Sequence, residues 1–166
     1  MDGFHHYQDY LLSHTCLRDG DEISMVKIKG APVTFDLDLL RERIDLVSSG
    51  ATCGWPEYNR LTHNPKENAI TVNEDIVLLE GNYLLLDEPG WESLSDFADY
   101  TIRISANPEM LFTRLVDRKI KSGNSREAAT EFVNYSDMVN VKTCLDHSKS
   151  ADLNLTLLET GEYVLM

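Results

Sequence analysis

The chain has no Gly-x-x-x-x-Gly-Lys-Ser/Thr motif, so these residues lack the backbone cradle with which that loop holds phosphates. Cysteine is scarce, and Cys16, Cys53 and Cys144 form no Cys-x-x-Cys pair, which argues against a zinc site or a disulfide framework. No apolar run approaches the ~20 residues that a transmembrane helix needs. The polar first residues do not resemble a signal peptide. We therefore expect a cytoplasmic protein without a membrane partner.

Basic residues are also few, because 15 Lys and Arg stand against 28 Asp and Glu, for a net charge of −13. This charge disfavours binding to nucleic acid or to an anionic membrane surface. It still permits a phosphorylated ligand, since a few arginines and a bound Mg²⁺ can dominate one pocket. A length of 166 residues with 42% apolar content predicts a single domain with a substantial core.

Local signals place several elements. Capping residues, prolines and glycine stops around apolar residues at helical spacing predict helices at 36–50, at 107–123 and from 124 onward. Apolar runs or alternation predict strands at 70–79, 100–104 and 152–158. Residues 91–97 are predicted to form a short helix, with Trp91 in the core. The remaining segments are predicted to be a strand end with a polar loop at 1–12, irregular chain at 19–34 and a loop at 51–69.

The most informative segment is Ile76-Val77-Leu78-Leu79, which is followed directly by Glu80 and Gly81. A continuous apolar run without alternation is typical of a strand that is buried on both faces in a parallel sheet. Open α/β sheets bind their ligands beyond the carboxyl ends of the strands. We therefore expect Glu80 to lie in a functional site rather than on an ordinary solvated surface.

Together with the first residues, this segment resembles the phosphoribulokinase/uridine kinase family of P-loop kinases, in particular its pantothenate-kinase-like and fructose-transport-kinase-like branch. The resemblance covers most of the chain and rests on five segments in the family's order: MDGFHHYQDYL at 1–11, KGAPVTFD at 29–36, WPEYNR at 55–60, EGNYLLLDEPGW at 80–91 and RLVDRKIKSGNSREAATEFV at 114–133. Members of the family carry a strand, a phosphate-binding loop and a helix before the DGFH segment. This chain begins after that unit.

The resemblance implies a three-layer α/β fold with a parallel sheet flanked by helices, without its first strand–P-loop–helix unit. It implies ATP-dependent phosphorylation of a hydroxyl on a small metabolite of the nucleoside, pantothenate or sugar type, with Mg²⁺. We expect a truncated gene model, an alternative start or a fragment, and little activity from the chain alone. The exposed sheet edge left by the missing strand favours homo-oligomers.

Two carboxylates are the predicted catalytic acids. By resemblance, Asp2 matches the acid that orients or deprotonates the acceptor hydroxyl, and Glu80 matches the acid beside Mg²⁺ and its water. Phosphoryl transfer needs such groups because catalysis consists mostly of positioning and charge neutralisation.

By resemblance, the DGFH segment and the loop around 56–60 face the acceptor, which makes His5, Tyr7, Tyr58 and Arg60 the predicted acceptor residues. Aromatic and hydroxyl-bearing side chains suit a small polar substrate, and arginine can bind an anionic group with two hydrogen bonds. In the family's Pro-x-Tyr-Asp-like loop, this chain has Asn59 in place of aspartate.

Arg114 and Arg118 are four residues apart on a predicted helix and therefore share a face. By resemblance they approach the transferred phosphoryl group from a lid at 114–127. Asp137 and Asn140 resemble a family pattern near the nucleotide base, although Ser136 replaces its first asparagine.

Two other functions stay open at this stage. One is a non-catalytic remnant that binds a metabolite or a partner chain, and the other is a nucleoside triphosphate hydrolase. ATP binding by the purified chain separates the kinase from the remnant, and acceptor-dependent ADP release separates the kinase from the hydrolase.

Overall fold

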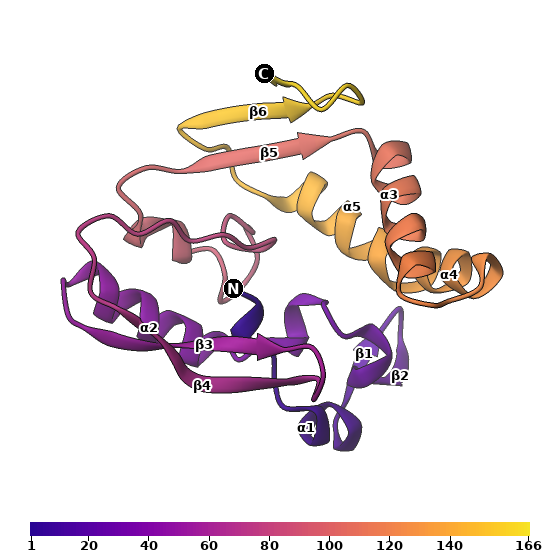
Figure 1. Ribbon diagram of the computed structural model, residues 1–166, viewed down its shortest axis with the longest axis horizontal. Helices are drawn as coiled ribbons and strands as arrows, with labels where there is room; N and C mark the ends of the chain where they lie inside the picture. The colour runs from indigo at the N-terminus through magenta and orange to yellow at the C-terminus, as the bar shows by residue number, and fades with distance from the viewer. The chain divides into compact units, whose positions relative to one another are not determined.

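The computed structural model describes residues 1–166 and divides into two compact units (Figure 1). The first unit comprises Met1–Leu84 and Gly90–Ala98, and the second comprises Leu85–Pro89 and Asp99–Met166. The single domain expected over 1–166 stays a prediction. None of the helices combines the length and the apolar character that crossing a membrane would demand.

The first unit contains two antiparallel hairpins and two α-helices. The hairpins are β1 with β2 and β3 with β4, and three-residue and four-residue 3₁₀ turns connect the elements. The bounds are η1 Asp2–Phe4, α1 Gln8–Ser13, β1 Thr15–Arg18, β2 Asp21–Ser24, η2 Met25–Ile28, η3 Pro32–Thr34, α2 Leu37–Ser48, β3 Cys53–Asn59, β4 Asn64–Val72 and η4 Leu94–Phe97.

The helix α2 forms where its sequence signals predict. The carboxylate of Asp36 accepts a hydrogen bond from the backbone N–H of Leu39, and Gly50 follows the helix with a φ of 78°. Leu40 and Ile44 are buried on one face of the helix. Local capping and helical spacing are therefore sufficient to specify this element.

An aromatic cluster fills the core of the first unit. The rings of Phe35, Tyr83 and Trp91 contact one another edge-on, with centroids 5.5 to 6.1 Å apart. The buried Tyr83 hydroxyl donates a 2.6 Å hydrogen bond to the carbonyl oxygen of Gly30. Trp91 is buried, which confirms its predicted place in the core.

Three predictions for this unit are wrong. Residues 51–69 are not a loop but hold β3 and most of β4, whose pairing shifts register between Trp55 and Glu57. Pro56 occupies that shift, where its missing N–H interrupts no regular ladder bond. Residues 1–12 form a 3₁₀ turn and a short helix instead of a strand end, and 19–34 include β2 and two 3₁₀ turns.

The predicted buried strand at 76–79 is also wrong, since only β4, which ends at Val72, belongs to a strand in this region. Ile76 and Leu78 are 90% and 89% exposed. A strand requires a hydrogen-bonded neighbour, and no other segment of the chain pairs with these residues. Their apolar character indicates burial, but the necessary partner lies nowhere in the 166 residues.

The second unit contains a three-stranded sheet and three α-helices. The strand order is β5-β6-β7, with β5 and β6 parallel and β6 and β7 antiparallel, so the sheet is mixed. The bounds are β5 Ile102–Ala106, α3 Pro108–Lys121, α4 Arg126–Phe132, a π-helical turn Val133–Asp137, α5 Met138–His147, β6 Leu153–Leu157 and β7 Tyr163–Leu165. The crossover from β5 to β6 passes through the helices, as parallel pairing requires.

The helix ends of this unit follow the predicted signals. Asn107 caps α3 by accepting a hydrogen bond from the N–H of Glu109, and Ser125 caps α4 by accepting one from the N–H of Ala128. Gly123 lies between the two helices with a φ of 101°. The helices share a small core in which Val116, Ala129 and Val133 are buried.

Candidate active site

The predicted acid pair converges at the start of the chain. The α-amino group of Met1 donates a 2.6 Å hydrogen bond to the backbone carbonyl of Glu80. Burial lowers the pKa of this amino group, and the nearby negative charges of Glu80 and Asp2 oppose the shift. The side chain of Met1 lies directly over Gly81, in space that a Cβ atom there would need. Both carboxylates therefore lie within electrostatic reach of one group.

Arg60 is distant from Asp2 in the sequence but pairs with it in the structure. Its guanidinium lies 3.9 Å from the carboxylate of Asp2, and the side chains of Arg60 and Asp2 are 85% and 63% exposed. An exposed pair at this distance stabilises the fold by about 1 kcal/mol or less. The guanidinium can therefore exchange Asp2 for an anionic ligand at little cost.

The 3₁₀ turn that carries Asp2 packs against β3. A Cβ atom on Gly3 would overlap the carbonyl group of Pro56, so only glycine allows the two backbones to lie this close. Beside this contact the buried ring of Phe4 meets Trp55 edge-on, with centroids 4.8 Å apart. These contacts fix Asp2 relative to the strand that leads to Arg60.

His5 connects the turn to the predicted acceptor residues. Its Nδ1 lies 2.8 Å from the carbonyl oxygen of Asp2, and a carbonyl can only accept, so Nδ1 carries the proton. The imidazole centroid is 4.0 Å from that of Phe35 and 5.3 Å from that of Tyr58. Burial lowers the pKa of His5, Asp2 opposes that shift and the charge of Lys29 adds to it. The ring is accordingly neutral near pH 7.

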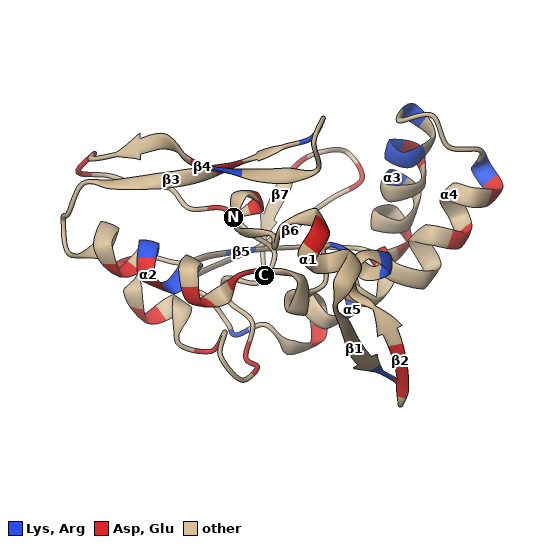
Figure 2. Cartoon of the chain, turned by 90° about the horizontal axis from the view of Figure 1, so that it is seen from below, with Lys and Arg blue, Asp and Glu red and all other residues tan.

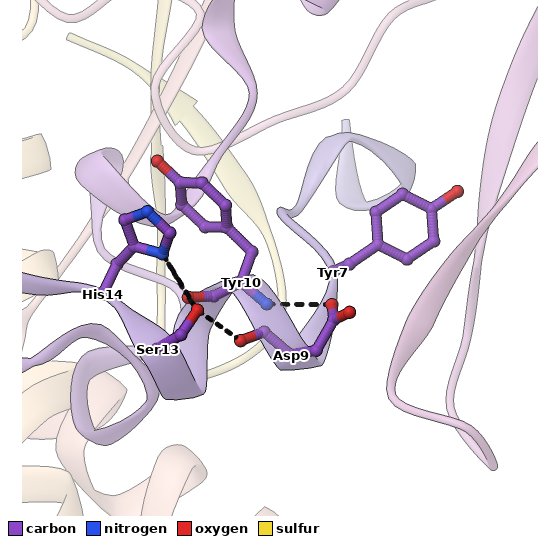
Figure 3. Close-up of a pocket in the computed structure, with 5 residues that line it drawn as sticks. All are labelled: Tyr7, Asp9, Tyr10, Ser13 and His14. Carbon is purple, nitrogen blue, oxygen red and sulfur yellow. Dashed lines mark hydrogen bonds between the residues drawn. The ribbon is translucent and has the colours of Figure 1, made fainter.

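Tyr7 lies on the same unit but in a different environment. Its hydroxyl donates a 2.8 Å hydrogen bond to the carboxylate of Glu67 on β4, and this bond raises the pKa of Tyr7. Tyr7 also lines an open hollow of about 540 Å³ along α1, together with Asp9, Tyr10, Ser13 and His14 (Figure 3).

The far side of this hollow is a stack of rings. The imidazole of His14 lies parallel to the ring of Tyr10, with centroids 3.8 Å apart, and accepts or donates a hydrogen bond with Ser13 (Figure 3). His6 contacts Tyr10 as well, at 4.3 Å. All five residues that line the hollow remain exposed to solvent, with Tyr7 42% and Tyr10 38% exposed.

Lys29 is a site residue that sequence reasoning missed. Its ammonium lies 5.1 Å from the centroid of the Tyr58 ring and donates hydrogen bonds to the side chain of Gln8 and the carbonyl of His63. It belongs to the KGAPVTFD segment, which resembles the family, but nothing in the local sequence predicts contacts with residues 34 positions away. These contacts depend on the packing of the hairpin.

The second unit carries the two predicted lid arginines. Arg114 and Arg118 are both exposed on α3, four residues apart, and Figure 2 shows basic residues gathered on this helix. Their shared face agrees with the helical spacing. Their approach to a transferred phosphoryl group stays a prediction.

Asp137 has a partner within the same unit. Its carboxylate lies 3.8 Å from the ammonium of Lys119, which also sits 3.5 Å from the centroid of the Phe132 ring. Burial raises the pKa of Asp137, and Lys119 opposes that shift. Asn140 follows on α5 and is partly buried. The predicted contact of Asp137 and Asn140 with a nucleotide base stays a prediction.

Comparisons with known proteins agree with the resemblance. The model of the "Phosphoribulokinase / Uridine kinase family" matches residues 4–162. The chain is 40% identical to the uncharacterised protein YggC of Escherichia coli K12 over 98% of its own length and 65% of that protein's. It is 30% identical to the pantothenate kinase of Serratia proteamaculans over 71% of its own length and 41% of the relative's. The chain thus spans less than two thirds of both proteins.

A solved structure confirms the fold. A crystal structure of a protein from Silicibacter sp. TM1040, provisionally named a fructose transport system kinase, superimposes with a TM-score of 0.84 at 28% identity. The match covers 93% of this chain and 71% of that one. The predicted α/β architecture of a P-loop kinase is therefore correct, with a mixed rather than purely parallel sheet.

Proposed function

This chain belongs to the phosphoribulokinase/uridine kinase family, and from that premise we propose that its protein transfers the γ-phosphoryl group of ATP to a hydroxyl of a small metabolite. The observation that supports the proposal is the arrangement around Asp2. Its carboxylate pairs with the distant Arg60, and the neighbouring Met1 donates a hydrogen bond to the backbone carbonyl of Glu80.

Asp2 is the group that acts on the acceptor. Its carboxylate is solvent-accessible, and its backbone is fixed by the turn that Gly3 packs against β3. Such a carboxylate can accept a hydrogen bond from the acceptor hydroxyl, orient it and take its proton as transfer proceeds. Arg60 and Tyr58 bind the rest of the acceptor, and the neutral ring of His5 contacts the Tyr58 ring.

The donor set fits Mg²⁺. Magnesium prefers oxygen ligands, keeps several waters and is usually held by one or two carboxylates together with substrate phosphates. Glu80 is an exposed carboxylate whose charge, like that of Asp2, acts on the amino group of Met1, and no cluster of three potential protein ligands is present, so a dedicated protein cage is not what this site offers. When bound, the ion would neutralise phosphate charge. Glu80 would hold it through one oxygen or through a water.

The triphosphate itself does not fit these residues alone. The chain has no Gly-x-x-x-x-Gly-Lys-Ser/Thr loop, and neither the first unit nor α3 replaces a row of backbone N–H groups. We assign to this chain only the acceptor, the metal carboxylate and the arginines Arg114 and Arg118, which would stabilise charge on the transferred group.

The acceptor class follows from the side chains around Asp2. The Tyr58 ring, the Arg60 guanidinium and the His5 imidazole suit a compact polyhydroxylated molecule. The relatives include a protein named pantothenate kinase. Nucleosides, pantothenate and sugars are therefore the compounds to test.

The deciding experiment compares two proteins. One is the 166-residue chain, and the other is the same chain joined to a strand–P-loop–helix unit taken from a family member whose sequence contains the Gly-x-x-x-x-Gly-Lys-Ser/Thr motif. ADP formation is measured with each acceptor and without any. Acceptor-dependent ADP release by the joined protein supports the kinase.

The other outcomes identify the rival functions. Phosphate release that no acceptor stimulates favours a nucleoside triphosphate hydrolase. Binding of an acceptor without turnover by either protein favours a non-catalytic metabolite-binding role. We expect the 166-residue chain alone to turn over far more slowly than the ~1–100 s⁻¹ of typical kinases.

A further inference from the structure

Lys29 holds two separate segments of the first unit. Its ammonium donates a 2.8 Å hydrogen bond to the side-chain oxygen of Gln8, at the start of α1, and another of 2.8 Å to the carbonyl of His63. His63 immediately precedes β4, at the turn of the β3–β4 hairpin. One side chain thereby ties this turn to the helix that follows the DGFH segment.

A second contact joins the same two places. The backbone N–H of Gln8 donates a 2.7 Å hydrogen bond to the side-chain oxygen of Asn64, the first residue of β4. Gln8 therefore meets the hairpin through its backbone and meets Lys29 through its side chain. The side chain of Lys29 and the backbone N–H of Gln8 therefore both attach the hairpin turn to the start of α1.

The ammonium of Lys29 also lies close to the ring of Tyr58, which is one of the predicted acceptor residues. Its 5.1 Å distance to the centroid of the Tyr58 ring is within the range of a cation–π interaction. Tyr58 and Arg60 flank Asn59, whose side chain accepts hydrogen bonds from the N–H groups of Leu61 and Thr62 in the same turn. A shift of the turn would move both acceptor residues.

The cations Lys29 and Arg60 differ in the groups to which their N–H donors are directed. Lys29 is half-buried and its donors are directed at Gln8 and His63, whereas the Arg60 guanidinium is 85% exposed and only loosely paired at 3.9 Å. An ammonium whose N–H groups already donate to acceptors of the protein has few N–H groups left to bind a ligand. Lys29 and Arg60 therefore have different roles.

We propose that Lys29 is a positioning residue, which fixes the β3–β4 hairpin so that Tyr58 and Arg60 face the acceptor beside Asp2. It acts through the hairpin and does not touch the acceptor. This role rests on the proposed kinase function where it concerns the acceptor, but the attachment of the hairpin can be measured without any activity.

The first test uses hydrogen exchange on the 166-residue chain. Lys29→Met removes the ammonium and keeps a long side chain, and Lys29→Arg keeps a cation with several donors. Lys27→Met is the matched control, because Lys27 is an exposed lysine two residues earlier, on the 3₁₀ turn that Lys29 follows. We expect Lys29→Met to speed exchange at the amides of Gln8, Leu61 and Thr62 by about tenfold, as loss of charge-assisted hydrogen bonds predicts, and Lys27→Met to leave it unchanged.

The second test measures kinetics in the joined protein. Lys29→Met should raise the acceptor KM by about tenfold and leave kcat within about twofold, and Lys29→Arg should recover most of the loss. A fall in kcat at unchanged KM would assign Lys29 to the chemistry and overturn the proposal. Unchanged exchange in Lys29→Met would overturn it as well.

The variant Gln8→Ala provides a second test of the attachment in case Lys29→Met does not fold. If Lys29→Met fails to fold by circular dichroism, Gln8→Ala still removes one partner of the ammonium and should speed exchange in the hairpin turn. No change in that variant would refute the attachment. Lack of acceptor-dependent turnover in the unmutated joined protein would refute the kinase function alone, while hydrogen exchange still decides the role of Lys29.

Discussion

Gly3 and Pro56 touch through their backbones, so closely that a Cβ atom on Gly3 would overlap the carbonyl of Pro56. Residue 3 belongs to the turn that carries Asp2, and residue 56 lies where β3 and β4 shift register. The glycine of the DGFH segment is thus a packing requirement. It allows the turn to lie flat on the strand that leads to Arg60.

Replacing Gly3 with alanine should destabilise the first unit. The added methyl group forces the turn away from β3, and overpacking of this kind costs about 1–3 kcal/mol. Gly20→Ala is the control, since Gly20 has a φ of 90° but open space around it and should lose only about 1 kcal/mol through backbone strain. Urea unfolding of both variants measures the difference.

The comparison separates steric overlap from loss of backbone freedom. Equal losses in the two variants would mean that the turn moves without cost and that Gly3 does not fix Asp2. A larger loss for Gly3→Ala, together with a weaker acceptor affinity, would connect this packing to the site.

Cys144 should react with alkylating agents more slowly than Cys16. Burial raises the pKa of its thiol to about 11, and the charge of Arg103 only partly opposes this. At pH 8 the thiolate is then about 0.1% of the total, and the thiolate is the reactive form. Treatment with iodoacetamide at pH 8, followed by peptide mapping, should label Cys16 before Cys144, although both side chains are partly exposed.

Denaturation supplies the control for this prediction. In urea, Cys144 should react at the same rate as Cys16, because burial is the cause of its resistance. Rapid labelling of Cys144 in the native protein would mean that α5 is less well packed than the structure indicates.

The sequence predicts the elements whose causes are local. Asp36, Asn107 and Ser125 cap helices through hydrogen bonds to residues two or three positions away, and glycines end two of those helices. Capping and helical spacing act within one or two turns, so a single sequence carries them completely.

Features that depend on distant partners escape local reasoning. Pro56 and its neighbours look like a loop because Gly and Pro are common there, yet β4 pairs with them and absorbs the proline in a register shift. Residues 76–79 look like a buried strand because of their side chains, yet no neighbour in the chain provides the hydrogen bonds. In both cases a strand forms only where another segment of the chain provides its hydrogen-bonded neighbour.

The candidate site divides in the same way. Asp2, Glu80 and Arg60 could be named through the family resemblance, and in the structure Asp2 pairs with Arg60 while the backbone of Glu80 contacts Met1. Lys29 could not, because its acceptors on Gln8 and His63 are set by how the hairpin packs on α1. Residue type identifies groups that bind ligands more readily than groups that hold other residues in place.

Acid should destabilise the protein partly through His5. Burial lowers the pKa of His5 below the value of about 6.5 that it has when unfolded. The neutral ring therefore contributes stability above pH 6.5, and this contribution is lost as the pH falls through the folded-state pKa. Burial lowers the pKa of His6 as well, which adds to the effect.

The variant His5→Asn tests this pH dependence, because asparagine can still donate to the carbonyl of Asp2 but does not titrate. The fall in unfolding free energy between pH 7.5 and pH 5.5 should be smaller in His5→Asn than in the unmutated chain. His63→Asn is the control, since His63 is exposed and asparagine tolerates its φ of 54°. If His5→Asn loses as much stability as the unmutated chain, His5 is not the group that responds to acid.

The last prediction concerns Glu80 in the protein joined to its phosphate-binding unit. Glu80→Gln keeps the shape of the side chain and removes the charge proposed to hold Mg²⁺ and its water. It should therefore lower kcat by about 10²-fold or more and change the acceptor KM little. Tyr58→Ala should do the opposite, raising the acceptor KM with a smaller effect on kcat, because Tyr58 is proposed to bind the acceptor.

A structural role for Glu80 would give a different pattern. In the 166-residue chain the contact with Met1 uses the backbone carbonyl of Glu80 and not its side chain, so Glu80→Gln removes no hydrogen-bond partner of Met1. A circular dichroism melt of the variant should therefore match that of the unmutated protein, which separates catalysis from folding. Raising the Mg²⁺ concentration should recover part of the lost kcat if the carboxylate binds the ion. An unchanged kcat at saturating Mg²⁺ would show that Glu80 is a surface carboxylate, and the arrangement of Glu80, Asp2 and Arg60 would then no longer support a kinase site.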